Sequence, residues 1–102
     1  MNCPLVKLSV VIPSKNEGDN LRECITEIIQ SLIEHNIENE ILIIDDGSTD
    51  NTANIVKDLN IKFPSVNYLL NEGENGFGRA VRLGLQKFTG DAVAVMMADR
   101  SD

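Results

Sequence analysis

The side chains that could do chemistry gather in three short segments of the sequence. Each segment holds carboxylates beside turn-forming residues: residues 13–17, 45–50 and 98–102. We single out Glu17, Asp46 and Asp99, one from each segment. A carboxylate accepts hydrogen bonds from hydroxyl and amino groups, and its oxygens suit Mg²⁺ or Mn²⁺. The same residue types also cap helices and form turns, so a structural role is the alternative for each of them.

The cysteines and the histidine favour structural roles. Cys3 and Cys24 have neither the spacing of a metal site nor the density of a disulfide scaffold, so we expect reduced thiols, with Cys24 in the core. His35 is the only histidine and follows the first helical pattern. A cationic side chain at the C-terminal end of a helix complements the helix dipole, and we expect this role for His35 rather than catalysis.

Hydrophobic periodicity predicts alternating strands and helices. Continuous apolar runs predict strands over residues 8–12, 40–44, 66–70 and 92–97. Apolar residues spaced by three and four predict helices over residues 21–33, 53–59 and 77–88. Pro13 is expected to end the first strand, Asn16 or Asp19 to cap the first helix, and Gly90 to end the third helix in a left-handed conformation.

This order predicts an α/β fold: an open, doubly wound, mostly parallel sheet with helices on both faces. The strands read as buried on both faces, because their apolar runs do not alternate with polar residues. In such sheets ligands bind beyond the carboxyl ends of the strands. The three acidic segments follow the first, second and fourth strands, so we expect them along one edge.

Composition restricts the class of protein. The chain has 102 residues, with 16 acidic and 9 basic side chains and a net charge of −7. Its length suits a single domain, residues 1–102, or part of one. The acidic balance argues against a nucleic-acid partner. No apolar run is long enough for a membrane helix, and the first residues do not resemble a signal peptide, so we expect a cytoplasmic segment.

Several motifs in a fixed order resemble the family 2 glycosyltransferases. They are VIPSKNE (residues 11–17), IIDDGSTDNT (43–52), NGFGRA (75–80), GD (90–91) and MAD (97–99). The likeness extends from residue 8 to residue 102 and is strongest to the dolichol-phosphate mannosyltransferase branch. It implies the Rossmann-like GT-A fold of nucleotide-diphospho-sugar transferases, here the N-terminal portion of the catalytic domain, truncated after the fourth strand.

The resemblance also implies a nucleotide-sugar site. By motif position, the base and ribose pocket would include Pro13, Lys15, Glu17, Ile44 and Asp46. Many relatives have Tyr where this chain has Lys15, whose stem would pack on the base while its charge meets a phosphate. Asp45 should point away from Asp46 and serve the fold, because neighbours in an extended chain alternate sides.

The phosphates and the metal would lie nearby. Arg79 opens the third predicted helix beside two glycines, so it is a candidate for a pyrophosphate or base contact, with a surface arginine as the alternative. Relatives end the fourth strand in Asp-X-Asp, which holds Mg²⁺ or Mn²⁺; here Met97 replaces the first acid. Asp99 is the expected ligand, with help from Ser101 or Asp102.

The implied activity is transfer of a hexose from a nucleotide-diphospho-sugar to an acceptor, either a polyprenyl phosphate at the cytosolic face of a membrane or a cell-envelope glycan. The family's acceptor-side residues and catalytic base lie beyond the fourth strand, so this chain alone is expected to be inactive. Its last strand would have an open edge, which favours dimerisation. The alternative is a non-catalytic, receiver-like nucleotide- or cation-binding module. It is disfavoured because the first strand is followed by Pro13 rather than by an acidic pair.

Overall fold

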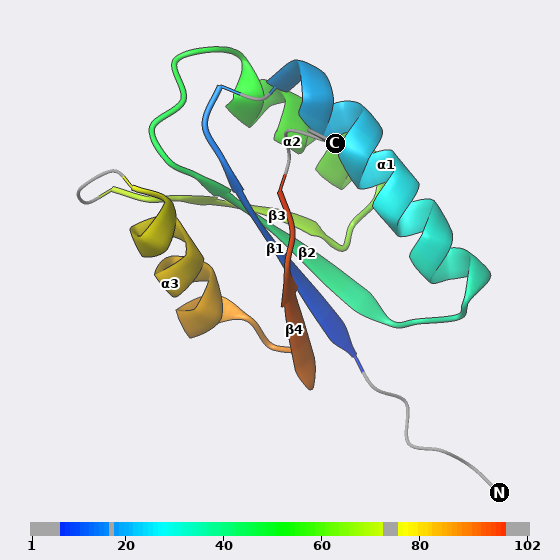
Figure 1. Ribbon diagram of the computed structural model, residues 1–102. Helices are drawn as coiled ribbons and strands as arrows, with labels where there is room; N and C mark the ends of the chain where they lie inside the picture. The colour runs from blue at the N-terminus through cyan, green and yellow to red at the C-terminus, as the bar shows by residue number, and fades with distance from the viewer. Residues whose placement is uncertain (1–6, 17, 73–75, 98–102) are drawn as a thin grey trace, which may run out of the picture.

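Strands and helices alternate along the whole described chain. The structure is a computed structural model that describes residues 7–16, 18–72 and 76–97 (Figure 1). The elements are β1 (Leu8–Ser14), α1 (Gly18–Glu34), β2 (Asn39–Asp45), α2 (Thr52–Lys62), β3 (Val66–Leu70), α3 (Phe77–Lys87) and β4 (Ala92–Val95). All seven predicted elements are present, so the periodicity identified each type correctly.

The four strands form one parallel sheet in the order β3-β2-β1-β4. Helices α1 and α2 cover one face and α3 covers the other (Figure 1). This is the predicted open, doubly wound α/β architecture. The strand order reverses between β1 and β4, so the carboxyl ends of these strands form the crevice where such folds bind ligands.

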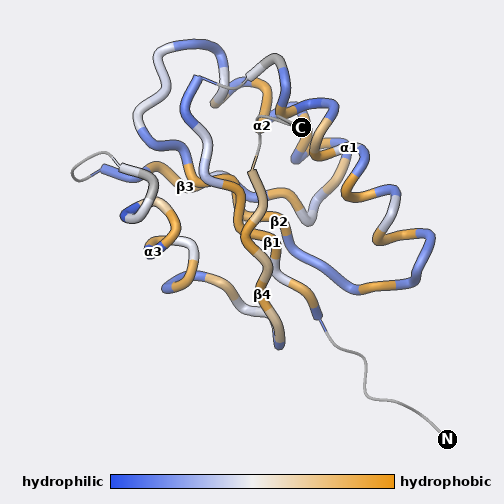
Figure 2. The backbone as a smooth tube through the Cα atoms, in the orientation of Figure 1, coloured by the Kyte–Doolittle hydropathy of each residue, from blue (hydrophilic) through white to orange (hydrophobic). Residues whose placement is uncertain are grey.

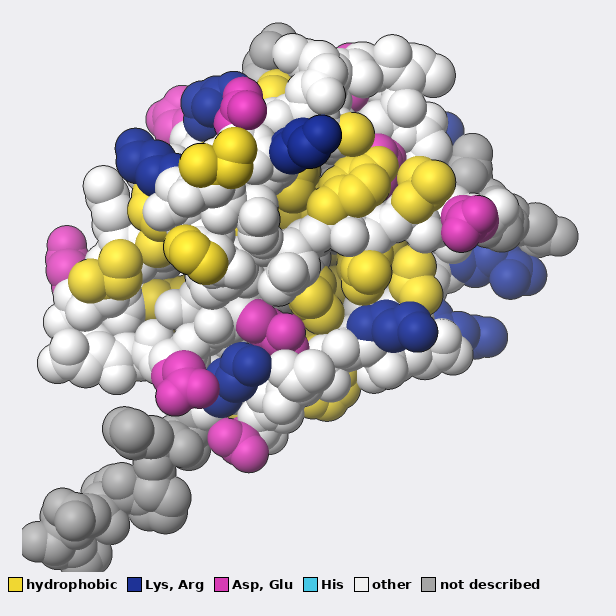
Figure 3. Space-filling view, turned by 180° about the vertical axis from the view of Figure 1, so that it is seen from behind, with side chains coloured by type: hydrophobic (Ala, Val, Ile, Leu, Met, Phe, Trp, Pro, Cys, Tyr) yellow, Lys and Arg dark blue, Asp and Glu magenta, His cyan; other side chains and the backbone are white. Residues whose placement is uncertain are grey.

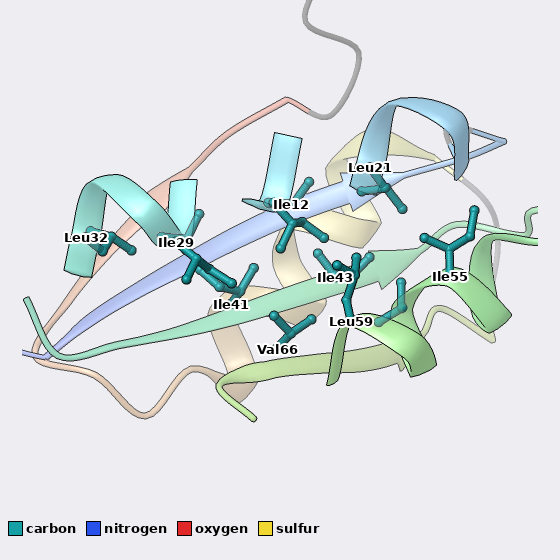
Figure 4. Close-up of a cluster of buried hydrophobic side chains, with 12 residues drawn as sticks. Ile12, Leu21, Ile29, Leu32, Ile41, Ile43, Ile55, Leu59 and Val66 are labelled. Carbon is teal, nitrogen blue, oxygen red and sulfur yellow. The ribbon is translucent and has the colours of Figure 1, made fainter. Parts of the chain in front are cut away.

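Each face of the sheet has its own apolar core. Beneath α1 and α2, the strands contribute alternate residues that pack against the apolar side of both helices (Figure 4): Val10, Ile12, Leu21, Ile25, Ile29, Leu32, Ile41, Ile43, Ile55, Val56, Leu59 and Val66. The intervening strand residues Val11, Leu42 and Ile44 pack on Ala80 of α3. Hydropathy along the chain follows this division, with largely apolar central strands and alternating apolar and polar residues along the helices (Figure 2). Because successive side chains of a strand point to opposite faces, residue parity fixes the face on which each side chain lies.

The sequence analysis predicted that Pro13 ends β1, and this prediction is wrong. The strand continues through Pro13 to Ser14, both paired with β2. Val11 accepts a hydrogen bond from the Met96 amide on the β4 side, whereas Ser14 accepts one from Asp46 on the β2 side. Pro13 has the same parity as Val11, so its missing amide points past the end of β4. Proline therefore costs β1 no ladder hydrogen bond.

Two other predictions are wrong. Strand β4 ends at Val95 and is only partly covered, with Val95 43% and Met97 52% exposed, because among the described residues it pairs with β1 alone. Gly90 has no positive φ. It is needed because a Cβ there would lie 2.5 Å from the Ser9 hydroxyl.

Acidic and basic side chains are interspersed on the surface shown in Figure 3, with hydrophobic side chains between them.

Candidate functional site

The loops that follow β1 and β2 are tied together by Asn16. Its side-chain oxygen accepts hydrogen bonds from the main-chain amides of Thr49 (2.7 Å) and Asp50 (3.2 Å). The main-chain amide of Asn16 donates to the Ser48 hydroxyl (2.9 Å). Asn16 has φ 55°, a left-handed conformation that Asn tolerates better than most residues. Two of the three predicted acidic segments therefore lie side by side at the carboxyl edge of the sheet.

Asp50 caps helix α1 from the neighbouring loop. Its Oδ2 accepts a hydrogen bond from the Gly18 amide at 3.2 Å. The prediction that Asn16 or Asp19 caps this helix is wrong, because Asn16 is engaged by the other loop and Asp19 lies inside the helix. The pKa of Asp50 is lowered, first by the hydrogen bond from the Thr52 side chain. Asp50 thus has a structural role at the edge of the site.

Asp45 faces the α1 and α2 side of the sheet. Its Oδ2 accepts a 2.5 Å hydrogen bond from the Tyr68 hydroxyl, and its Oδ1 accepts one from the Ser48 amide at 2.8 Å. Burial, and next the bond to Asp45, raise the pKa of Tyr68 to about 12. Asp45 therefore supports the loop and β3, as expected from its position.

Asp46 faces the opposite side, toward the start of α3. Its Oδ1 accepts a hydrogen bond from the Asn71 side-chain amide at 2.9 Å. The Gly76 amide donates to both carboxylate oxygens, at 3.1 and 2.9 Å. Gly76 is the residue that precedes α3 and has φ 150°, which strongly favours glycine. The carboxylate of Asp46, only 7% exposed, thus occupies the N-terminal end of α3, where the sequence analysis expected an anion.

The other predicted ligand residues are placed as follows. Pro13 and Ile44 are register partners in β1 and β2, and the side chain of Ile44 is fully buried in the core beneath α3. Only the main chain of Ile44 is thus available to a ligand. Lys15 is exposed in the loop after β1, and Arg79 is exposed in the first turn of α3. Glu17 lies outside the described residues.

The predicted metal ligands also lie outside the described residues: Asp99, Ser101 and Asp102. Within the described ranges, no group of three or more His, Cys, Asp or Glu side chains is arranged to hold a metal ion. The carboxylates of Asp45, Asp46 and Asp50 accept hydrogen bonds from protein groups instead.

Sequence reasoning missed Asn71 and Gly76, which hold the Asp46 carboxylate. Asn71 follows β3 directly, and its amide extends the pairing with β2 by bonding the Asp45 carbonyl at 2.8 Å. The rule that polar residues after parallel strands share one edge would have included Asn71, had it been applied to the third strand. Gly76 donates only from its main chain, so its residue type gave no such signal.

Cys24 and His35 lie where the sequence analysis expected them. Cys24 is buried in α1 and forms no disulfide with a described residue. His35 follows the end of α1, and its Nδ1 donates to the Ser31 carbonyl at 2.8 Å. Because α1 ends at the amino edge of the sheet, His35 is remote from the candidate site.

Comparisons with known proteins agree on one family. A model of glycosyl transferase family 2 matches residues 9–101. A dolichol-phosphate mannosyltransferase from Pyrococcus furiosus is 36% identical over 94 residues, which is 92% of this chain and 26% of that protein. No helix in the described ranges has the length and apolar character needed to cross a membrane.

Two solved structures have the same fold. Mannosyl-3-phosphoglycerate synthase from Rubrobacter xylanophilus matches 95% of this chain and 32% of its own, with a TM-score of 0.82 and 26% identity. The mannosyltransferase PcManGT from Pyrobaculum calidifontis, in complex with GDP-Man and Mn²⁺, matches 90% of this chain and 27% of its own, with a TM-score of 0.79. At 23% identity the latter shows the fold alone. The chain thus spans about a quarter to a third of the length of these proteins.

Proposed function

The chain belongs to glycosyl transferase family 2, and from this premise we propose that it supplies the nucleotide-sugar-binding part of a glycosyltransferase. The reaction would transfer a hexose from a nucleotide-diphospho-sugar to an acceptor. The bond between the sugar C1 and the diphosphate oxygen breaks, an acceptor oxygen bonds to C1, and the nucleoside diphosphate leaves. The acceptor would be a polyprenyl phosphate, at the cytosolic face of a membrane, or a cell-envelope glycan.

One observation carries the proposal: Asp46, directly after β2, accepts a hydrogen bond from the amide of Gly76, the residue that precedes α3. This contact joins the β2 edge to the helix that bears Arg79. An acceptor for base or ribose donors and a cation for phosphates therefore lie on neighbouring elements. Lys15, exposed in the loop after β1, adds a second cation at this edge.

The remaining roles follow by motif position. Pro13 and the main chain of Ile44 would border the base, and Glu17 would accept a hydrogen bond from the ribose. Asp99 would hold Mg²⁺ or Mn²⁺, which neutralises charge on the leaving diphosphate. In this proposal residues 1–102 form the N-terminal portion of the catalytic domain.

Nucleotide binding tests the proposal directly. Calorimetry of the intact protein with UDP, GDP and their hexose conjugates, with and without Mn²⁺, should show metal-dependent binding that Asp46→Ala abolishes. Asp58→Ala is the matched control, because Asp58 is an exposed acid in α2 whose closest cation is Arg22 at 3.9 Å. If the folded protein binds no nucleotide in the presence of Mn²⁺, the proposal fails.

Self-association through β4 is a separate part of the proposal. Strand β4 pairs with β1 on one side only, and its end exposes Val95 and Met96. A groove of about 310 Å³ separates it from α1 and is lined mainly by apolar side chains. An open strand edge beside such a groove favours pairing between two copies. Sedimentation should show a dimer at high concentration, and a monomer at all concentrations would contradict it.

A further inference from the structure

The hydrogen-bonding capacity of Asp46 is almost fully used within the protein. An ionised carboxylate has about four lone-pair positions, two on each oxygen. Asn71 occupies one position on Oδ1, and the Gly76 amide occupies one on each oxygen. Among the described residues no other donor reaches this carboxylate. Asp46 therefore has a single position left for a ligand, on Oδ2.

Burial and main-chain hydrogen bonds keep the number of positions that Asp46 can offer to a ligand at one. Asp46 is 7% exposed, so a ligand can approach only a small part of the carboxylate. The Asp46 amide donates to the Ser14 carbonyl at 2.8 Å, and the Asn71 amide to the Asp45 carbonyl at the same distance. The main chain at Asp46, the acceptor, and at Asn71, one of its donors, is thus hydrogen-bonded to the sheet. Turning the carboxylate to offer both oxygens to a ligand would break the bonds to Asn71 and Gly76.

Nucleobases differ in the number of donors that they present side by side. Guanine presents a ring N–H and an amino group next to each other, which match two acceptor positions. Uracil and thymine present one ring N–H between two carbonyl groups. Cytosine and adenine present an amino group beside a ring nitrogen whose lone pair repels a carboxylate.

We propose that this site selects a nucleotide-sugar whose base is an imide, uracil or thymine, and discriminates against one whose base is guanine. The inference rests on the proposed function and names its substrate class. The ring N–H of the imide donates to the one available position on Asp46, and Lys15, exposed in the loop after β1, would serve a flanking carbonyl. Guanine presents two adjacent N–H donors, and only one of them can pair with the available position on Asp46. The other is buried without an acceptor unless Asn71 or Gly76 is displaced. This base preference differs from that of the structural neighbour PcManGT, which is in complex with GDP-Man.

The test compares UDP, N3-methyl-UDP and GDP by calorimetry with the intact protein in Mn²⁺. UDP should bind roughly 10-fold to 100-fold more tightly than GDP, because an unpaired buried donor costs about that factor. Methylation of N3 removes the donor and should weaken UDP by a similar factor. Equal or tighter binding of GDP, or no effect of N3-methylation, would overturn the inference while leaving the proposed function intact. Absence of binding by every nucleotide would overturn both.

A variant tests the role of Asn71 separately. Asn71→Ala vacates a position on Oδ1, so the ratio of UDP to GDP affinity should fall by about 5-fold or more. Asn67→Ala is the matched control, because Asn67 is an exposed residue of β3, and among the described residues its side chain bonds the Ser65 carbonyl alone. An unchanged ratio in a folded Asn71→Ala protein would contradict the count of positions. If that variant does not fold, the N3-methyl comparison decides the question.

Discussion

The hydroxyl of Tyr68 donates a 2.5 Å hydrogen bond to Oδ2 of Asp45, which joins β3 to the loop after β2 beneath α1 and α2. The same carboxylate accepts the Ser48 amide, so Asp45 is committed to the fold. Holding Asp45 on this face fixes its neighbour Asp46 on the other, toward α3. Two adjacent carboxylates thereby lie on opposite faces: Asp45 supports the loop, and Asp46 is the one that we propose faces the ligand.

The first prediction concerns the titration of Tyr68. It is the only tyrosine in a chain without tryptophan, so the absorbance change on phenolate formation reports this residue alone. Its pKa is raised to about 12 by burial and by Asp45. The titration midpoint should therefore lie well above the ordinary value of 10.0. A midpoint near 10 in the folded protein would contradict the hydrogen bond.

The sign of the linked stability follows from this shift. Because the pKa is higher in the folded state, Tyr68 stabilises the fold fully below pH 10, and that contribution is lost as the pH rises toward 12. Asp45→Asn removes the negative charge and should lower the midpoint. Asp91→Asn is a control that should leave the midpoint unchanged, since Asp91 bonds the Lys7 amide at the opposite edge.

Local patterns predicted the fold, whereas the contacts between loops needed the structure. Element types followed from apolar spacing, and the sidedness of Asp45 and Asp46 from strand alternation. The caps did not: Asp50 reaches Gly18 and Gly76 reaches Asp46 across about thirty residues of sequence. These partners depend on the order of the strands in the sheet, and the spacing of residues along the sequence does not indicate that order.

The second prediction concerns acid stability and Glu40. This carboxylate is 8% exposed and accepts hydrogen bonds from the Ser9 hydroxyl (2.6 Å) and the Thr89 amide (2.5 Å). Burial alone would raise the pKa of Glu40, but these hydrogen bonds and the charge of Lys7 outweigh it and hold the pKa below its ordinary 4.5. A lowered folded pKa stabilises the protein above pH 4.5, and this contribution is lost as the pH falls further.

Glu40→Gln should therefore lower the free energy of unfolding at neutral pH by about 1–3 kcal/mol and flatten its decline below pH 4.5. Urea unfolding at a series of pH values measures both effects. Glu38→Gln is the control, because Glu38 is exposed two residues earlier. Equal losses in the two variants would show that Glu40 contributes nothing specific.

The third prediction separates the two roles of Asn16, its side chain and its left-handed backbone. Asn16→Gly keeps the φ of 55° accessible but removes the acceptor for Thr49 and Asp50, so it should destabilise by about 1–2 kcal/mol. Asn16→Ala adds strain of about 1–2 kcal/mol to that loss. Asn16→Asp retains an acceptor and should be the mildest change. Thermal unfolding that ranks Ala and Gly equal would contradict the strain.

The fourth prediction concerns a close approach of α3 to the sheet, at Gly84. A Cβ at this position would overlap the side chain of Val11, which is fully buried in β1. Gly84→Ala gains about 1 kcal/mol of helix propensity but forces α3 away from β1, and overpacking of this kind costs about 1–3 kcal/mol. The packing cost should win, so the variant should unfold at a lower temperature.

Gly78→Ala is the matched control, since a Cβ there meets nothing within 4 Å and the same helix gains the propensity without the clash. It should be neutral or stabilising by up to about 1 kcal/mol. Val11→Ala removes the two Val11 methyl groups that lie nearest to the new Cβ, so the double variant with Gly84→Ala should be more stable than the sum of the single changes predicts. If the two changes are additive, α3 does not pack on β1 through this contact.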